Sequence, residues 1–231
     1  MEKVICSWSG GKDSAMALHE VVKSKRYEVL ALLTVLTEEY DRISMHGVRR
    51  VLLEDQAESV GFHLEKIYIT KDSSNSEYES KMKDALERYA AKGVGSAVFG
   101  DIFLEDLKKY REGKLAALNL KGVFPIWKKD TRALAEHFLA LGFKAIITCV
   151  DSKVLPKEFA GRKFDEWFLS ELPAGVDPCG ENGEFHSFVY DGPIFKKKIE
   201  LTIGETVLRN ERYYFCDLLP MKLQNLAERL T

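Results

Sequence analysis

The amino-acid sequence predicts an α/β protein in which a parallel, doubly wound sheet with helices on both faces is followed by a smaller α+β region. Three observations predict this fold. Apolar, strand-like segments alternate with amphipathic, helix-like segments as far as residue 150. From about Asp151 this alternation gives way to a stretch rich in loop-forming residues. The 231 residues are 45% hydrophobic and 30% charged, a composition typical of a globular protein with one sizeable core.

Six short apolar segments predict the strands. Their length, and the polar or glycine-containing segments between them, are typical of strands buried between two layers. They are residues 3–8, 28–35, 64–69, 95–102, 123–127 and 143–150. Ligands of such sheets bind outside the carboxyl ends of the strands. We therefore expect a binding site among the loops that follow Trp8, Val35, Gly100 and Val150.

Five segments between these strands predict helices. In residues 14–25 the apolar side chains of Ala15, Leu18, Val21 and Val22 recur at helical spacing and mark one buried side. The helices predicted at residues 75–92 and 130–141 are closed by Gly93 and Gly142, as helices commonly are. The other predicted helices, with these two, are residues 47–60, 75–92, 104–118 and 130–141.

The C-terminal part of the chain has a different pattern. Prolines interrupt regular structure in the loop-rich residues 151–191. The elements predicted after them are two strands and a final helix, at residues 197–203, 213–215 and 218–230. We therefore predict a boundary near Asp151, between residues 1–150 and residues 151–231.

Composition narrows the classes of partner and compartment. The net charge is −2 and no long basic stretch occurs, so stable nucleic-acid binding is disfavoured. The four cysteines include no CxxC pair, which is typical of a reducing cytoplasm and not of a disulfide framework. No apolar run approaches the roughly 20 residues that span a membrane. We expect a cytoplasmic protein without a membrane segment.

The strongest motif lies between the first predicted strand and the first predicted helix. Its glycines let the backbone turn tightly, and the N–H groups there can bind an anion. Lys12 adds a positive charge, and the carboxylate of Asp13 can hold Mg²⁺ together with phosphate oxygens. The alternative without ligand binding is a tight turn in which Asp13 or Ser14 caps the helix. The motif is Ser9-Gly10-Gly11-Lys12-Asp13-Ser14.

This motif is neither a Walker A loop nor a dinucleotide-binding loop, because its glycine and lysine spacing differs from both. It resembles the SGGxDS signature of the PP-loop ATP pyrophosphatases, which are similar in their Rossmann-like fold to other adenine-nucleotide α-hydrolases. The resemblance implies that residues 9–14 bind the triphosphate of ATP with Mg²⁺. It also implies that ATP is cleaved to AMP and pyrophosphate to adenylylate a substrate, with residues 1–150 as the ATP-binding domain.

A second motif occurs in the loop-rich region. Glu181 and Glu184 can bind a cationic group, orient a nucleophile or act as a base. Two alternatives stay open: a polar turn, and a metal site made of Cys179, Glu181, Glu184 and His186, whose spacing matches no known zinc pattern. The motif is Asp177-Pro178-Cys179-Gly180-Glu181-Asn182-Gly183-Glu184-Phe185-His186-Ser187-Phe188.

Together the two motifs resemble the diphthine–ammonia ligase family, which pairs an SGGKDS loop with a downstream Glu-Gly-Gly-Glu-aromatic run. Its members use ATP and ammonium to amidate diphthine, a modified histidine of translation elongation factor 2. The resemblance implies catalytic roles for Lys12, Asp13, Glu181 and Glu184. It also implies a substrate-binding region at residues 151–231. The substrate-side candidates are Asp101, Glu181, Asn182, Gly183, Glu184 and His186.

The sequence departs from this family at three places. Asn182 replaces a glycine, His186 replaces a residue that is often acidic, and residues 100–106 differ from the usual stretch after the fourth strand. The chain therefore resembles a variant branch found in bacteria, which lack diphthamide. The nucleotide chemistry carries over better than the identity of the carboxylate substrate.

Several lesser candidates lie near predicted strand ends. Asp101 can hold metal or substrate. An equally good interpretation is that it caps the helix predicted at residues 104–118. His46 can contact ligand, although capping or plain exposure is the simpler interpretation. Lys128, Asp130 and Arg132 follow another strand, and Asp130 is the natural helix cap.

Three classes of function are compatible with the sequence. The first is an ATP-dependent amide ligase that takes a carboxylate and ammonium. The second is another PP-loop enzyme, of the tRNA-thiolation or sulfonucleotide type, for which Cys179 is the one well-placed cysteine. The third is a non-catalytic sensor of ATP or AMP. A homo-oligomer is compatible with all three.

Overall fold

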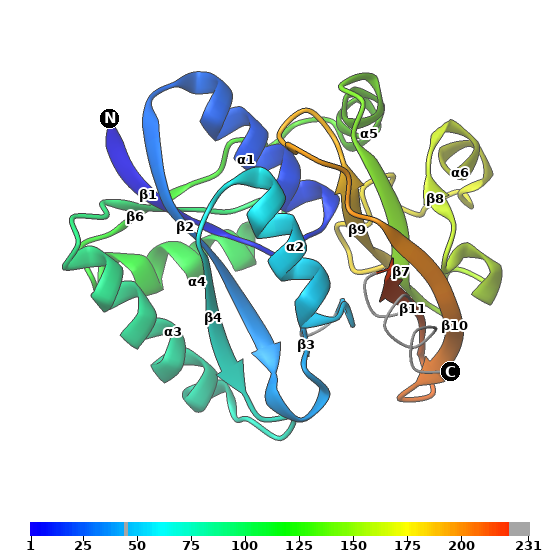
Figure 1. Cartoon of the computed structure of the whole chain (residues 1–231), viewed down its shortest axis with the longest axis horizontal. Coiled ribbons are helices and arrows are strands. Elements are labelled where there is room, and N and C mark those ends of the chain that lie inside the picture. Colours follow the sequence, from blue (N-terminus) through cyan, green and yellow to red (C-terminus); the bar gives the residue numbers. More distant parts are fainter. Residues whose placement is uncertain (44–45, 222–231) are drawn as a thin grey trace.

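The computed structural model describes residues 1–43 and 46–221, which form two sheets lying side by side (Figure 1). In the first sheet, five parallel strands lie in the order β4-β2-β1-β5-β6, and a short antiparallel strand, β3, pairs with the end of β2. The predicted α/β fold with a parallel sheet is confirmed. The strands are β1 (Glu2–Ser7), β2 (Tyr27–Thr37), β3 (Arg42–Ile43), β4 (Leu64–Ile69), β5 (Ser96–Val98) and β6 (Lys121–Val123).

Helices cover both faces of this sheet. Successive residues of β1 point to opposite faces and pack against different helices. Val4 and Cys6 join an apolar cluster with the buried sides of α1 and α2. Ile5 joins a second cluster with α3 and α4. The helices are α1 (Lys12–Ser24), α2 (Arg50–Val60), α3 (Asn75–Ala90) and α4 (Glu105–Ala116), with a 3-10 turn at η1 (Glu38–Tyr40).

The strand order creates a switch point between β1 and β5. The chain runs outward from β1 to β2 and β4, then returns to place β5 on the other side of β1. The loops that leave the carboxyl ends of β1 and β5 therefore diverge to opposite faces and open a crevice, where ligands of such sheets bind.

The second sheet is antiparallel and is built around β7. β9 runs along one side of β7, while β8 and β11 share the other side, and β10 pairs with β11. Figure 1 shows α5 and α6 beside this sheet. The elements are α5 (Thr131–Ala140), β7 (Lys144–Asp151), η2 (Lys157–Phe159), β8 (Lys163–Phe164), α6 (Glu166–Glu171), β9 (Phe185–Asp191), β10 (Leu201–Arg209) and β11 (Tyr213–Pro220).

Several details of the predicted secondary structure are wrong. The strand predicted at residues 197–203 is β10, which begins at Leu201 and continues to Arg209. The strand predicted at residues 143–150 lies in the antiparallel sheet, and the region predicted as loop contains β9. The strand predicted at residues 123–127 ends at Val123, where a turn begins. β11 continues through Pro220, so the final helix does not start at residue 218; its predicted residues 222–231 lie outside the described part.

Within the described residues, no helix combines the length and apolar character needed to cross a membrane. The four cysteines of the chain are all buried and form no disulfide within that part.

Candidate functional site

The loop between β1 and α1 is held in place by its glycines and by one buried amide side chain. Gly10 has a φ of 73°, and a Cβ atom there would lie 2.6 Å from Oε1 of Gln56. Gln56, on α2, donates from Nε2 to the carbonyl oxygen of Gly10 at 2.9 Å and accepts from Nε1 of Trp8 at 3.0 Å. The backbone N–H of Val189 on β9 also donates to the Gly10 oxygen. Both sheets therefore fix the loop.

Helix α1 begins at this loop with its N-terminus open toward the crevice. Its N-cap is Gly11, which has no side chain to occupy the helix end. The Ser9 hydroxyl accepts from the N–H of Gly11 at 3.2 Å, and the Ser14 hydroxyl donates to the Gly11 carbonyl at 2.9 Å. The N–H of Lys12 donates to the Ser187 hydroxyl at 3.2 Å. The start of a helix attracts anions because of its N–H groups and its dipole.

Lys12 and Asp13 form an ion pair at the bottom of the crevice. Nζ of Lys12 lies 2.7 Å from each carboxylate oxygen of Asp13. The lysine side chain is 4% exposed and the aspartate 31%, so the aspartate is the partner that faces the open space. Burial alone lowers the pKa of Lys12, but the adjacent carboxylate outweighs it and the pKa is raised. Lys12 therefore stays charged.

Glu181 faces this pair from the second motif. One of its carboxylate oxygens, Oε1, accepts from the backbone N–H of Ile102 at 2.7 Å, just beyond the end of β5. Burial, with a further contribution from Asp13, raises the pKa of Glu181 to about 7, against the effect of the Ile102 hydrogen bond. This carboxylate can therefore hold or release a proton near neutral pH.

Glu184 has a different environment from Glu181. Glu184 is 7% exposed, and its carboxylate accepts from the N–H of Asp177 at 3.1 Å and from the N–H and Nδ2 of Asn182 at 3.0 and 2.9 Å. These contacts close the loop of the second motif on itself. The geometry therefore supports a role for Glu184 in ordering that loop.

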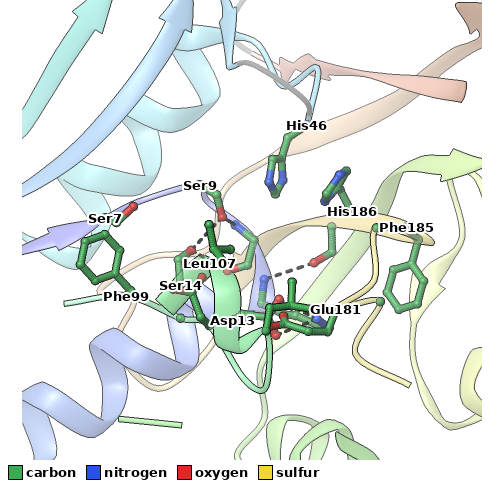
Figure 2. Close-up of a pocket in the computed structure, with 18 of the residues that line it drawn as sticks. Ser7, Ser9, Asp13, Ser14, His46, Phe99, Leu107, Glu181, Phe185 and His186 are labelled. Carbon is green, nitrogen blue, oxygen red and sulfur yellow. Dashed lines mark hydrogen bonds and ion pairs between the residues drawn. The ribbon is translucent and has the colours of Figure 1, made fainter. Parts of the chain in front are cut away.

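The two motifs line one cleft of about 250 Å³ at the switch point (Figure 2). Most of the predicted site residues lie in its wall: Ser9, Gly11, Lys12, Asp13, Ser14, Asp101, Glu181, Gly183 and His186. Three others lie outside its described lining: Gly10, Asn182 and Glu184. Gly10 shapes the phosphate loop, and Asn182 and Glu184 bond to each other behind the wall.

Arg111 is a lining residue that the sequence analysis missed. It lies on α4, and its Nε is 2.7 Å from Oδ2 of Asp101, which is 8% exposed. Its guanidinium also lies 4.5 Å from the ring centre of Phe99. Nothing in the sequence distinguishes it from the other charged residues of this helix. Only the packing of α4 against the end of β5 turns this arginine toward the cleft.

Two imidazoles form the opposite part of the wall. The ring centres of His46, before α2, and His186, on β9, lie 4.3 Å apart (Figure 2). His46 therefore lines the cleft, and plain exposure is the wrong interpretation of it. By contrast, Asp130 accepts from the N–H of Ala133 at 2.8 Å, so the helix-cap interpretation is confirmed for that residue.

The residues fit Mg²⁺ bound with phosphate and do not fit a metal held by protein ligands alone. Among the described residues, no group of three or more His, Cys, Asp or Glu side chains could hold a metal ion. Magnesium usually takes one or two carboxylates together with phosphate oxygens, which Asp13 beside an anion-binding helix start can provide. Cys179 is buried, its thiol donates to the Thr131 carbonyl, and burial raises its pKa to about 12.

Comparison with known proteins extends over both motifs. The model of the diphthamide synthase N-terminal domain matches residues 2–121, and that of the diphthamide synthase C-terminal domain matches residues 130–219. A diphthine–ammonia ligase of Danio rerio is 28% identical over 234 residues, covering 90% of each chain. That of Mus musculus is 27% identical, covering 87% of this chain and 84% of the relative. That of Schizosaccharomyces pombe is 30% identical, covering 89% of this chain and 37% of the longer relative.

Proposed function

The chain belongs to the diphthamide synthase family, as its sequence motifs predict, and on this premise we propose that it is an ATP-dependent amide ligase of the diphthine–ammonia ligase type. It cleaves ATP to AMP and pyrophosphate, adenylylates a carboxylate, and transfers the acyl group to ammonia. The acceptor is diphthine or another carboxylate, on a protein side chain or a small molecule.

One observation carries this proposal. The phosphate loop at the end of β1 and Glu181 of the second motif face each other across a single cleft, at the switch point of the sheet. The loop binds anions, and the glutamate opposite can bind a cation or accept a proton. A ligase that joins an activated carboxylate to ammonium needs both properties side by side.

On the nucleotide side, the backbone of residues 9–14 holds the triphosphate at the N-terminus of α1. Lys12 stabilises the charge that develops on the leaving pyrophosphate. Asp13, the more exposed member of the pair, would hold Mg²⁺ together with phosphate oxygens. Bound Mg²⁺ supplies further neutralisation of phosphate charge.

On the acceptor side, Glu181 orients ammonium and takes a proton from it, since its pKa of about 7 suits both forms. Asp101 and Arg111 present one negative and one positive group to the substrate. Gly183 borders open space in the same cleft, because a Cβ atom there would meet nothing within 4 Å. Glu184 and Asn182 keep the loop in shape.

The division into an ATP-binding part, residues 1–150, and a substrate-binding part, residues 151–231, is retained as part of the proposal. In this division β7 belongs by sequence to the first part and by pairing to the second sheet. We place the reaction in the cytoplasm, where ATP and reduced thiols coexist.

Product analysis tests the proposal. Wild-type protein is incubated with ATP, Mg²⁺, ammonium and elongation factor 2 carrying diphthine, and separately with a metabolite extract. We expect AMP and pyrophosphate in equal amounts, and a loss of at least about 100-fold in Lys12→Ala and Asp13→Ala, because each removes charge stabilisation from the transition state. The exposed variant Lys157→Ala is the control.

The alternatives predict other results. ADP and phosphate as products would overturn cleavage between the α- and β-phosphates. ATP binding without turnover on either acceptor would favour the sensor. A thiolation enzyme needs a reactive thiolate, and the buried, hydrogen-bonded thiol of Cys179 counts against that reading.

A further inference from the structure

His46 and His186 lie against the anion-binding loop. A Cβ atom added to Gly11, the N-cap of α1, would lie 3.4 Å from Cε1 of His46 and 3.0 Å from the carbonyl oxygen of Ser187. The imidazole of His46 and the carbonyl of Ser187 therefore both lie close to Gly11. His186 directly precedes Ser187, whose hydroxyl accepts from the N–H of Lys12. Figure 2 shows both rings on the same side of the loop.

One atom of the pair lacks a partner. Nδ1 of His46 is buried and has no hydrogen-bond partner among the residues that the structure describes. Buried polar atoms are nearly always hydrogen-bonded, so such an atom in the wall of a cleft indicates a group that binds there. The neighbouring helix start indicates that this group is an anion.

The charges around the two rings also indicate that the bound group is an anion. Burial, the neighbouring His186 and Lys12 lower the pKa of His46 and outweigh a hydrogen bond with the Ser187 backbone, which raises it. Burial and Lys12 lower the pKa of His186 to about 4. Asp13 from α1 and Glu181 from the second motif line the same cleft. Both rings are therefore neutral at pH 7 while the cleft is empty. An added polyanion outweighs Lys12 and favours the protonated imidazole.

We propose that His46 and His186 bind the terminal phosphates of the nucleotide and take up a proton as they do so. This inference rests on the proposed ATP-dependent function. It places His186 on the nucleotide side, whereas the sequence analysis placed it on the substrate side.

The proton comes from solvent and resides on one imidazole nitrogen. When an oxygen of the acceptor carboxylate bonds to the α-phosphorus, the bond from that phosphorus to the bridging oxygen breaks. The electron pair of the broken bond stays on pyrophosphate, and the imidazolium offsets that charge. The proton returns to solvent when pyrophosphate leaves.

Nitrogen NMR of the histidine side chains tests this directly. The chain has five histidines, so ¹⁵N-histidine labelling gives few signals, which His46→Gln and His186→Gln assign. The probe is α,β-methylene-ATP with Mg²⁺ at pH 7, and inorganic pyrophosphate is a second probe. We expect at least one of the two imidazoles to change from the neutral to the imidazolium shift on saturation.

Affinity supplies the second readout. Each variant is expected to bind the probe about tenfold more weakly at pH 7, since a charge-assisted hydrogen bond is lost. Wild-type affinity falls as the pH rises from 6 to 8, and this slope is lost in the double variant. His137→Gln, at an exposed position of α5, is the matched control and binds as wild type does. Amide spectra verify that each variant is folded.

The outcomes separate the two proposals. If the probe binds and both imidazoles stay neutral, the histidine inference is overturned while the ATP-dependent function stands. If the variants bind as tightly as the control, the inference is overturned as well. If neither probe binds the folded wild type, both proposals fall together.

Discussion

Glu181 and Glu184 carry the same side chain three positions apart, yet their surroundings give them different chemistry. Glu184 accepts three hydrogen bonds from its own loop, and these bonds occupy its carboxylate. Glu181 faces the cleft, and burial raises its pKa to about 7. The sequence predicted both as catalytic candidates, because carboxylates in a glycine-rich loop look alike until neighbours are known. Glu181 is the one whose geometry suits proton transfer.

The raised pKa of Glu181 predicts a pH-dependent stability. Its folded-state pKa of about 7 exceeds the ordinary value, 4.5, so the folded protein binds more protons between these values. Stability therefore falls as the pH rises from 4.5 to 7. Glu181→Gln keeps the acceptor for Ile102 and removes the charge, so we expect it to raise the free energy of unfolding at pH 8 by about 1 kcal/mol after allowance for solvent screening.

Urea unfolding at pH 4.5 and pH 8 measures this difference. The variant and the wild type are expected to agree at pH 4.5, where Glu181 is protonated. Glu136→Gln, at an exposed position of α5, should change stability equally little at both pH values. Equal effects of Glu181→Gln at both pH values would contradict a raised pKa.

Among the elements, the end of β5 and the start of α1 come into direct contact where Gly100 follows the strand. A Cβ atom on Gly100 would lie 2.7 Å from the carbonyl carbon and oxygen of Asp13. These are backbone atoms, which cannot turn away as a side chain can. The contact brings Asp101 to the cleft beside Asp13. Sequence analysis placed Gly100 at a strand end but had no means of predicting this approach.

Gly100→Ala tests the contact between these elements. Because the added methyl group overlaps backbone, we expect the free energy of unfolding to fall by about 2 kcal/mol. Nucleotide affinity should fall as well, since the start of α1 is displaced. Gly113→Ala is the matched control: it lies exposed inside α4 with nothing within 4 Å of the added atom. There we expect a gain of about 0.5–1 kcal/mol. Equal effects of the two substitutions in denaturant unfolding would disprove the close approach.

At the scale of the whole molecule, several contacts attach the second sheet to the first, and two of them position the cleft. Asp217 on β11 pairs with Arg42 of β3 and with Arg49 before α2. On the other side, Val189 of β9 donates to Gly10 of the phosphate loop. The second attachment carries the second motif to the cleft, and the first holds the sheet in that position.

The attachment at Asp217 predicts an acid-sensitive interface. Burial alone raises its pKa, but the hydrogen bonds from Arg49 and Arg42 outweigh it and lower the pKa to about 2. A lowered folded-state pKa contributes stability above the ordinary value, 3.8, and this stability is lost as the pH falls toward 2. We expect Asp217→Asn to cost about 2 kcal/mol at pH 7 and much less at pH 2.

Thermal unfolding at the two pH values measures this loss. The control is Glu200→Gln, which removes an exposed pair with Lys198 and should cost less than about 0.5 kcal/mol. An unchanged melting temperature for Asp217→Asn at pH 7 would show that other contacts hold the sheets together.

The sequence by itself determined the local features of this protein: the parallel sheet, the strand–glycine–helix turn of residues 9–14, and the family to which both motifs point. The sheet and the turn follow from periodicity and turn chemistry, which act over a few residues, and the family follows from the resemblance of the two motifs. Tertiary structure alone decided the pairing of β9 along β7, the inward turn of Arg111, and the meeting of His46 with His186. Those contacts join residues far apart in the chain, and their energies depend on packing and burial that no short segment records.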